Sequence, residues 1–237
     1  MNNVDLFLKQ IKSENTSVKV FVPSLRKYVE FTPITVQQQK NIIKDTLSGV
    51  SGNIQLQRTL NNIIVDNNTG DDVITIIDRC AILTQLRIAY LGREVNVGNK
   101  KGTLQLITPE ALKDKVYPIE KTITDVLIVT LQAPTLIRDS GYVSFLTTNK
   151  EFINPGDLVN DLYVAEVAKF ITTITLGDNT VEPGIADSLR IVNELPTTLI
   201  TKIMKFIKVI KDIDNTWLIT TTGDQVQLGT QFFNDPV

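Results

Sequence analysis

The segment from Val73 to Leu91 is apolar on nearly every side, and it constrains the fold more than any other part of the chain. A helix with one polar side can lie on a protein surface, whereas a helix without such a side must be surrounded by other elements. Gly92 follows directly and is typical of a helix end. We therefore expect a central helix over 73–91. Its apolar residues are Ile74, Ile77, Ala81, Leu83, Leu86, Ile88 and Leu91.

Two short segments before this helix have the pattern of a β-hairpin. Apolar and polar residues alternate over 17–22, and a second segment runs from Tyr28 to Phe31. Pro23 and Ser24 lie between them and are typical turn residues. We predict two antiparallel strands joined by this turn.

Two further helices are predicted between the hairpin and the central helix. Thr35 with Gln38 three residues later has the spacing of a capping box, in which two side chains satisfy free backbone amides. Gly49 lies near the end of the first helix. The second helix follows Ser51, and its buried side is expected to consist of Leu56, Leu60, Ile63 and Ile64.

The middle of the chain changes in character. Segments 103–107, 122–131 and 142–146 are rich in β-branched and aromatic residues, which are enriched in strands. We expect a small sheet, or a mixture of helix and strand, in this region.

Helical patterns return near Asn154 and Pro155, which suit a helix cap and a first helical position. The buried side of this helix is expected to extend to Ile171, and a polar loop is expected over 177–184. A short helix should follow and end before Pro196.

The last long helix is expected to be capped by Thr197 or Thr198. Its apolar stripe consists of Leu199, Ile203, Phe206, Ile207 and Ile210. Gly223 and Asp224 then form a typical turn between two strand-like segments, which predicts a short closing hairpin.

The predicted fold class is therefore α+β: an N-terminal β-hairpin and helices, a small central β region, and C-terminal helices closing with a short hairpin. The corresponding ranges are 1–100, 101–150 and 151–237. These three ranges can also form one continuous domain, and sequence patterns do not choose between the two arrangements.

Composition argues against most kinds of catalytic site. Histidine is absent, which removes the catalytic triads, general bases and metal sites that depend on it. No glycine-rich phosphate-binding motif is present. Cys80 is the only cysteine, and inside an apolar helix it is expected to be a buried, inert thiol. We expect no enzymatic activity and no cofactor.

An oxygen-rich stretch at 66–72 has the general look of a cation-binding loop. A calcium loop of the EF-hand type needs glycine at its sixth position and glutamate at its twelfth, but Gly70 comes fifth and Ile77 twelfth. We expect a solvated loop in which Asp71 or Asp72 caps the next helix, and no metal site.

The formal net charge of −2, from 24 basic and 26 acidic residues, provides no overall field that would attract nucleic acid or an anionic membrane. Apolar runs are far shorter than the ~20 residues that cross a bilayer. We expect neither a nucleic-acid partner nor a membrane partner, and a soluble protein in the cytoplasm.

Two surfaces are candidates for binding a protein partner. Lys202, Lys205 and Lys208 recur every three residues on the polar side of the last helix, and they form either a basic strip for an acidic partner or a solvated helix face. Phe232 and Phe233 near the C-terminus either fold back onto the core or insert into a partner as aromatic anchors.

Several segments resemble one family. The sequences VFVPS at 20–24 and FTPITVQQQK at 31–40, the Leu195-Pro196 step into the last helix, and the Phe232-Phe233 ending are similar to baseplate hub and hub-assembly proteins of T-even-type contractile-tailed bacteriophages. The resemblance implies a structural or assembly role in the tail baseplate, with other tail proteins as partners and no catalytic residues. It implies a location in the host cytoplasm during assembly and, for a subunit, in the virion tail.

Two other functions remain open on the sequence. One is a small metal-dependent enzyme that uses carboxylates such as those of 66–72. The other is a general bacterial binding module. The oligomeric state is not indicated by the sequence.

Overall fold

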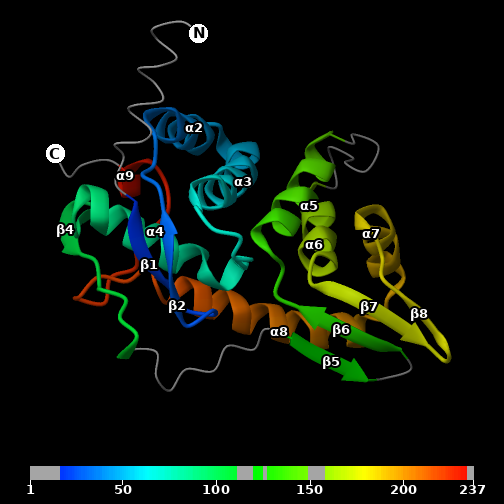
Figure 1. The fold of residues 1–237 in the computed structure, drawn as a ribbon. Helices are drawn as coiled ribbons and strands as arrows, with labels where there is room; N and C mark the ends of the chain where they lie inside the picture. The colour runs from blue at the N-terminus through cyan, green and yellow to red at the C-terminus, as the bar shows by residue number, and fades with distance from the viewer. Residues whose placement is uncertain (1–16, 111–119, 125–126, 149–157, 234–237) are drawn as a thin grey trace, which may run out of the picture.

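The widely apolar segment forms a helix at the centre of the molecule. The computed structural model describes residues 17–110, 120–124, 127–148 and 158–233, and in it a 3-10 turn η1 (Ile76–Asp78) leads into helix α4 (Arg79–Leu91) (Figure 1). The predicted start at Val73 is wrong, because Thr75 forms an antiparallel bridge with Thr135 and holds the preceding residues extended. The helix ends at Gly92 as predicted, where φ is 79°.

The N-terminal elements pack against α4 and confirm the predicted hairpin and helices. Strands β1 (Val18–Val22) and β2 (Lys27–Phe31) pair antiparallel, and helices α2 (Val36–Thr46) and α3 (Gly49–Asn67) follow. Both hydrogen bonds of the capping box between Thr35 and Gln38 are present. The side chain of Gln85 bonds to the backbone N–H and C=O of Phe21, which ties β1 to α4.

A second hairpin follows α4. Strands β3 (Glu94–Val97) and β4 (Lys100–Thr103) pair antiparallel. Within segment 103–107, Thr103 is the one residue in a strand, at the end of β4. After β4, Leu104 pairs with Thr220 in an isolated bridge, so this hairpin is joined to the C-terminal region.

The central β region belongs to a four-stranded antiparallel sheet with the order β5-β6-β7-β8. Its strands are β5 (Glu120–Thr124), β6 (Ile128–Gln132), β7 (Ile171–Leu176) and β8 (Asn179–Val181). Ile171 begins β7 and is not in a helix, and the loop expected over 177–184 contains β8. Gly177 enables the tight turn between these strands with φ at 58°, a conformation that costs glycine little.

Helices α5 (Leu136–Thr148), α6 (Leu158–Ala168) and α7 (Ile185–Glu194) lie on one side of this sheet in Figure 1. Segment 142–146 is helical, so the central region is a mixture of helix and strand, the second of the two arrangements expected there. Thr135 caps α5 by accepting the backbone N–H of Arg138, and Leu136, Tyr142 and Leu146 bury one helical face. The predicted cap at Asn154 and Pro155 lies outside the described residues.

Helix α8 (Thr197–Asn215) runs beneath both groups of elements and contacts η1, α4, α6 and β5 (Figure 1). Its predicted apolar stripe is confirmed: Leu199, Ile203, Phe206, Ile207 and Ile210 are buried. The predicted threonine cap is wrong, because Pro196 occupies the cap position and no side chain caps the helix.

The C-terminal region turns back on itself where the closing hairpin was expected, with Val226 N–H bonding to the carbonyl of Leu218 across the turn. A turn at Gly223 has φ at 90°, but Ile219 and Gln225 form only an isolated bridge and the flanking segments are not strands. Helix α9 (Thr230–Phe233) packs against α2, α4 and β3. One cluster of buried apolar residues includes members from 1–100, 101–150 and 151–237.

Candidate functional site

Six charged side chains of alternating sign form a continuous series of ion pairs through the interior. The series begins at the surface with Lys211 of α8 and ends in the core below α4. Each neighbouring pair has a nitrogen–oxygen distance of 3.3 Å or less. In order, its members are Lys211, Glu166, Lys169, Asp139, Arg79 and Asp214. We call this series the ion-pair chain.

Asp139 of α5 is the most highly coordinated member. Its Oδ1 accepts from Lys169 Nζ at 2.6 Å. Its Oδ2 accepts from the side-chain amides of Gln57 and Asn61, each at 2.7 Å, and from Arg79 at 3.3 Å. Because a buried carboxylate is costly unless its acceptor positions are filled, helices α3, α4 and α5 together stabilise its charge.

The other end of the ion-pair chain is held by Asp214 near the end of α8. Its Oδ2 lies 3.2 Å from Arg79 Nη2, and its Oδ1 accepts the backbone N–H of Cys80 at 2.8 Å. The amides of a first helical turn lack partners within their own helix. Asp214 therefore serves as an acceptor for the start of α4, supplied from the far end of the chain.

Local sequence explains how these side chains reach one another. Arg79 is the first residue of α4, and Asp139 lies in the first turn of α5, four residues after the Thr135 cap. Glu166 and Lys169 are three residues apart and form an ion pair at 2.7 Å, as residues at this spacing on a helix can.

The surroundings shift the pKa of each central group. Burial opposes ionisation of Asp139, but the positive charges of Lys169 and Arg79 outweigh it and lower its pKa to about 2. Burial likewise disfavours the charged form of Lys169, yet Asp139 and Glu166 raise its pKa. For Asp214 burial is the stronger effect, and its pKa is raised despite Arg79.

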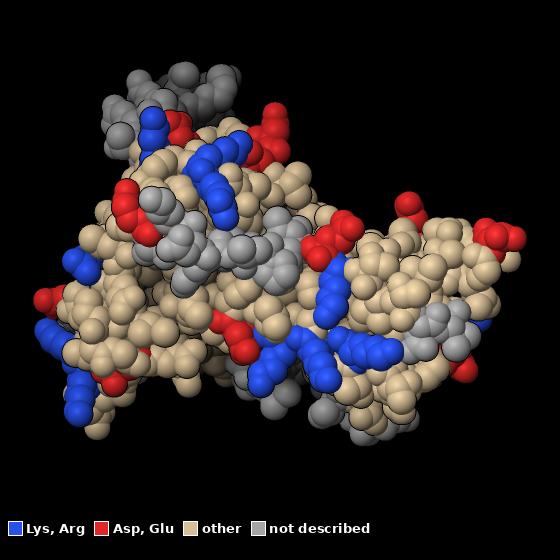
Figure 2. Space-filling model, turned by 90° about the horizontal axis from the view of Figure 1, so that it is seen from below, with Lys and Arg blue, Asp and Glu red and all other residues tan. Residues whose placement is uncertain are grey.

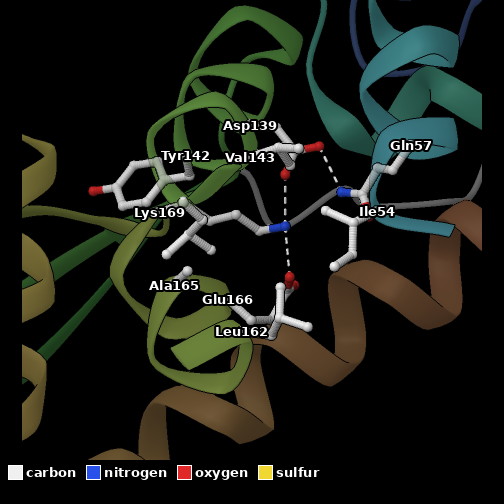
Figure 3. A pocket seen from close by; sticks show the side chains of 10 residues that line it. Ile54, Gln57, Asp139, Tyr142, Val143, Leu162, Ala165, Glu166 and Lys169 are labelled. Carbon is white, nitrogen blue, oxygen red and sulfur yellow. Dashed lines mark hydrogen bonds and ion pairs between the residues drawn. The ribbon is translucent and has the colours of Figure 1, made fainter. Parts of the chain in front are cut away.

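A pocket of about 270 Å³ opens beside the centre of the ion-pair chain (Figure 3). In Figure 3 the ammonium group of Lys169 lies between the carboxylates of Asp139 and Glu166, and Gln57 reaches Asp139 from α3. Leu162, from α6, contributes to the apolar part of the wall. A lysine acts as a nucleophile or base only when its pKa is depressed, so the raised pKa suits Lys169 to a structural role.

Cys80 is buried, as expected from its position in the apolar helix. Burial raises the pKa of its thiol well above the usual value, and the charge of Asp214 adds to this effect. A thiol in this condition is not a nucleophile near neutral pH.

The polar groups of the oxygen-rich loop at 66–72 bond to one another and to a neighbouring lysine. Asn68 accepts the backbone N–H of Gly70 and donates to the carbonyl of Asp72, while the Asp72 carboxylate pairs with Lys27. The expected cap by Asp71 or Asp72 is wrong, because the next helical turn begins at Ile76 with Thr75 before it. Among the described residues, no group of three or more His, Cys, Asp or Glu is placed to hold a metal ion.

The three predicted partner-binding lysines of α8 are exposed. Lys and Arg side chains gather near the middle of the face seen in Figure 2, which is the lower side where α8 runs in Figure 1. Val209 lies beside Lys205 and Lys208 on this side of the helix and is 45% exposed. We call Lys202, Lys205, Lys208 and Val209 the α8 strip.

Phe232 and Phe233 are not available to a partner in this structure, so their prediction as partner-binding residues is corrected. Their side chains are 0% and 2% exposed, and the two rings meet edge to face with centroids 4.9 Å apart. The guanidinium of Arg87 lies 5.9 Å from the centre of the Phe232 ring. The tail has folded back onto the core because burying two aromatic rings is strongly favourable.

An apolar groove on the surface was missed by sequence reasoning. It lies between the β7–β8 hairpin and α7, has a volume of about 1020 Å³, and contains six apolar residues together with a charged rim. Leu176 and Val181 in it are 57% and 50% exposed. The missed signal was the alternation within 171–181, which was taken for a helix end and a loop. The apolar residues of this α7 groove are Leu127, Ile174, Leu176, Val181, Ile191 and Leu195.

Comparison with known proteins adds no relative. Models of protein families, curated protein sequences and solved structures all give no match to this chain. Within the described residues, no helix has the length and apolar character needed to cross a bilayer.

Proposed function

We propose that this chain is a structural or assembly protein of the tail baseplate of contractile-tailed bacteriophages, acting at or near the hub through contacts with other tail proteins. The observation that carries a protein-binding role is the α7 groove. The side chains of Leu176 and Val181 are 57% and 50% exposed in this groove, which has a volume of about 1020 Å³. Concave apolar surfaces of this kind are typical binding sites for protein segments.

The resemblance to baseplate hub proteins of the segments at 20–24 and 31–40, the Leu195-Pro196 step into α8 and the Phe232-Phe233 ending supports the phage tail as the setting. The arrangement of charged residues agrees with this role. Asp139 and Lys169 form an ion pair inside the core, where they join helices.

The first experiment asks whether the protein belongs to the particle. Mass spectrometry of purified phage particles should detect it if it is a subunit. If it is an assembly factor, particles should lack it, and a phage with a stop codon in this gene should accumulate incomplete tails. Particles that lack the protein, together with normal tail assembly by the mutant phage, would contradict both forms of the proposal.

The second experiment tests the groove. The double variant Leu176→Asp/Val181→Asp places two charges in the apolar surface, and both positions are exposed, so folding should be preserved. We expect it to lose binding to purified baseplate proteins of the same phage. The matched control is Val36→Asp/Leu47→Asp, which alters two residues of comparable exposure, 68% and 77%, at α2. Equal binding by both double variants would remove the groove from the mechanism.

A further inference from the structure

The rim of the α7 groove carries a net negative charge. Glu182 follows β8, Asp187 and Glu194 lie on α7, and Arg190 is the one basic residue among the rim positions. All four side chains are exposed. A segment that fills the groove therefore needs apolar groups for the floor and positive charge at the edges.

The α8 strip of the same chain has these two properties. Lys205 and Lys208 are exposed on α8, and Val209 directly follows Lys208 and is 45% exposed, so the strip combines two ammonium groups with an apolar side chain. Lysine also places a long apolar stem along any surface it covers. In its chemistry the strip is the complement of the groove.

The two surfaces do not meet within one molecule. Leu176, Val181 and Val209 all remain exposed in the folded chain, at 57%, 50% and 45%. Any contact between groove and strip must therefore join two copies.

We propose that the α8 strip of one copy docks into the α7 groove of a second copy. The two surfaces differ, so the contact is head-to-tail: each copy keeps a free groove or a free strip, and association continues into a ring or an open chain. This inference rests on the proposed use of the groove for protein binding, and it assigns the occupant as a copy of the same chain.

The test uses charge reversal on the full-length protein and sedimentation velocity over a range of concentrations. The groove variant is Glu182→Lys/Glu194→Lys, and the strip variant is Lys205→Glu/Lys208→Glu. The wild type should form larger species as its concentration rises, and less so in high salt, which screens exposed charges. Each variant alone should weaken association at least about tenfold, because like charges then face each other across the contact.

The decisive variant carries all four reversals in one chain. It presents a basic groove and an acidic strip, so association should return. Matched controls reverse exposed charges elsewhere, namely Lys100→Glu/Lys101→Glu and Glu94→Lys/Glu110→Lys, and these should associate like the wild type. Circular dichroism and thermal unfolding establish that every variant is folded.

The outcomes separate this inference from the proposed function. A wild type that stays monomeric at all concentrations, or a fourfold reversal that fails to restore association, overturns head-to-tail docking. If the groove variant then loses purified tail proteins, the groove still serves the proposed function with a different occupant. Association with full rescue, alongside no binding of any tail protein, supports the docking and contradicts the baseplate role.

Discussion

The Oδ1 atom of Asp139 lies 2.6 Å from the Nζ atom of Lys169, and the two side chains are only 1% and 5% exposed. The pair joins the first turn of α5 to the residue that follows α6. Removing one partner from such a pair leaves an uncompensated charge in the interior, which costs far more than the intact pair contributes.

Asp139→Asn is therefore expected to lower the free energy of unfolding at pH 7 by about 3 to 5 kcal/mol. The amide cannot balance the charges of Lys169 and Arg79, although it keeps the shape of the side chain. Urea unfolding followed by the fluorescence of Trp217 measures the change. The matched control is Asp71→Asn in an exposed loop, which should change the free energy by less than about 0.5 kcal/mol. Similar losses of unfolding free energy for both variants would mean that the Asp139–Lys169 pair contributes no more to stability than an exposed aspartate does.

We also expect the stability difference between the wild type and Asp139→Asn to depend on pH. The pKa of Asp139 is lowered to about 2 in the folded chain, so its contribution to stability is present above the pKa of the unfolded chain, near 4, and is lost as the pH falls toward 2. The difference in stability between wild type and Asp139→Asn should shrink by about 2 kcal/mol between pH 5 and pH 2.

The stability of Asp139→Asn must be subtracted from that of the wild type at each pH, because other carboxylates change the stability with pH in the opposite direction. Burial raises the pKa of Asp78 and Asp214, so their protonation in mild acid favours the folded state. The contribution of Asp78, which lies outside the ion-pair chain, is present in both proteins and cancels in the difference, whereas Asp214 is linked to Asp139 through Arg79. Parallel stability curves for the two proteins over this range would contradict the lowered pKa of Asp139.

Phe232→Ala is expected to destabilise the fold by about 3 to 5 kcal/mol, because it removes a fully buried ring and leaves a cavity under α9. Thermal unfolding provides the measurement. Val36→Ala, at a position that is 68% exposed, is the control and should leave the midpoint nearly unchanged. An unchanged midpoint for Phe232→Ala with loss of partner binding would restore the tail as a docking segment.

Gly102→Ala should be destabilising by about 1 to 3 kcal/mol, since added atoms in a packed site force neighbours to move. A Cβ at this position would lie 2.7 Å from the Cγ2 atom of Thr220. Thr220→Ser removes that methyl group and keeps the hydroxyl, which accepts the backbone N–H of Asp224, so the double variant should recover most of the loss.

Gly184→Ala is the control for this pair of substitutions, because a Cβ there meets nothing within 4 Å. All four proteins can be compared by urea unfolding. Failure of Thr220→Ser to rescue Gly102→Ala would show that the close approach between β4 and the C-terminal turn is not the cause.

Cys80 should react with iodoacetamide far more slowly in the folded protein than in urea, because its thiol is buried and its pKa is raised. Mass spectrometry of timed samples gives both rates. Asp214→Asn weakens the attachment of α8 to the start of α4, so we expect it to increase the rate in the folded protein. Equal rates with and without urea would contradict the burial of this residue.

Local patterns predicted those parts of the fold that depend on neighbouring residues. The capping box at Thr35 and Gln38, the stop at Gly92 and the stripe of α8 each arise within one or two helical turns, and all three are confirmed. Segment 142–146 is rich in residues that favour strands, and local patterns left sheet and helix open there; it lies inside α5 together with Gly141.

The ion-pair chain depends on contacts that no local pattern contains. Arg79 and Asp214 are 135 residues apart, and Asp139 and Lys169 are 30 apart. The position of Asp139 four residues after Thr135 became informative only once 136–148 was known to be helical. The α7 groove was missed for a similar reason, since it exists only where β8 pairs with β7 beside α7.

The late position of α8 has a consequence for synthesis on the ribosome. When residues 1–196 have been made, Arg79, Asp139, Glu166 and Lys169 are all present, but Asp214 and Lys211 are still missing. Until residue 214 has been made, Arg79 has only Asp139 as its carboxylate partner in the ion-pair chain, and the backbone N–H of Cys80 at the start of α4 lacks its acceptor. Premature termination within α8 should yield products that proteases remove, so only chains that contain Asp214 would persist in the cell.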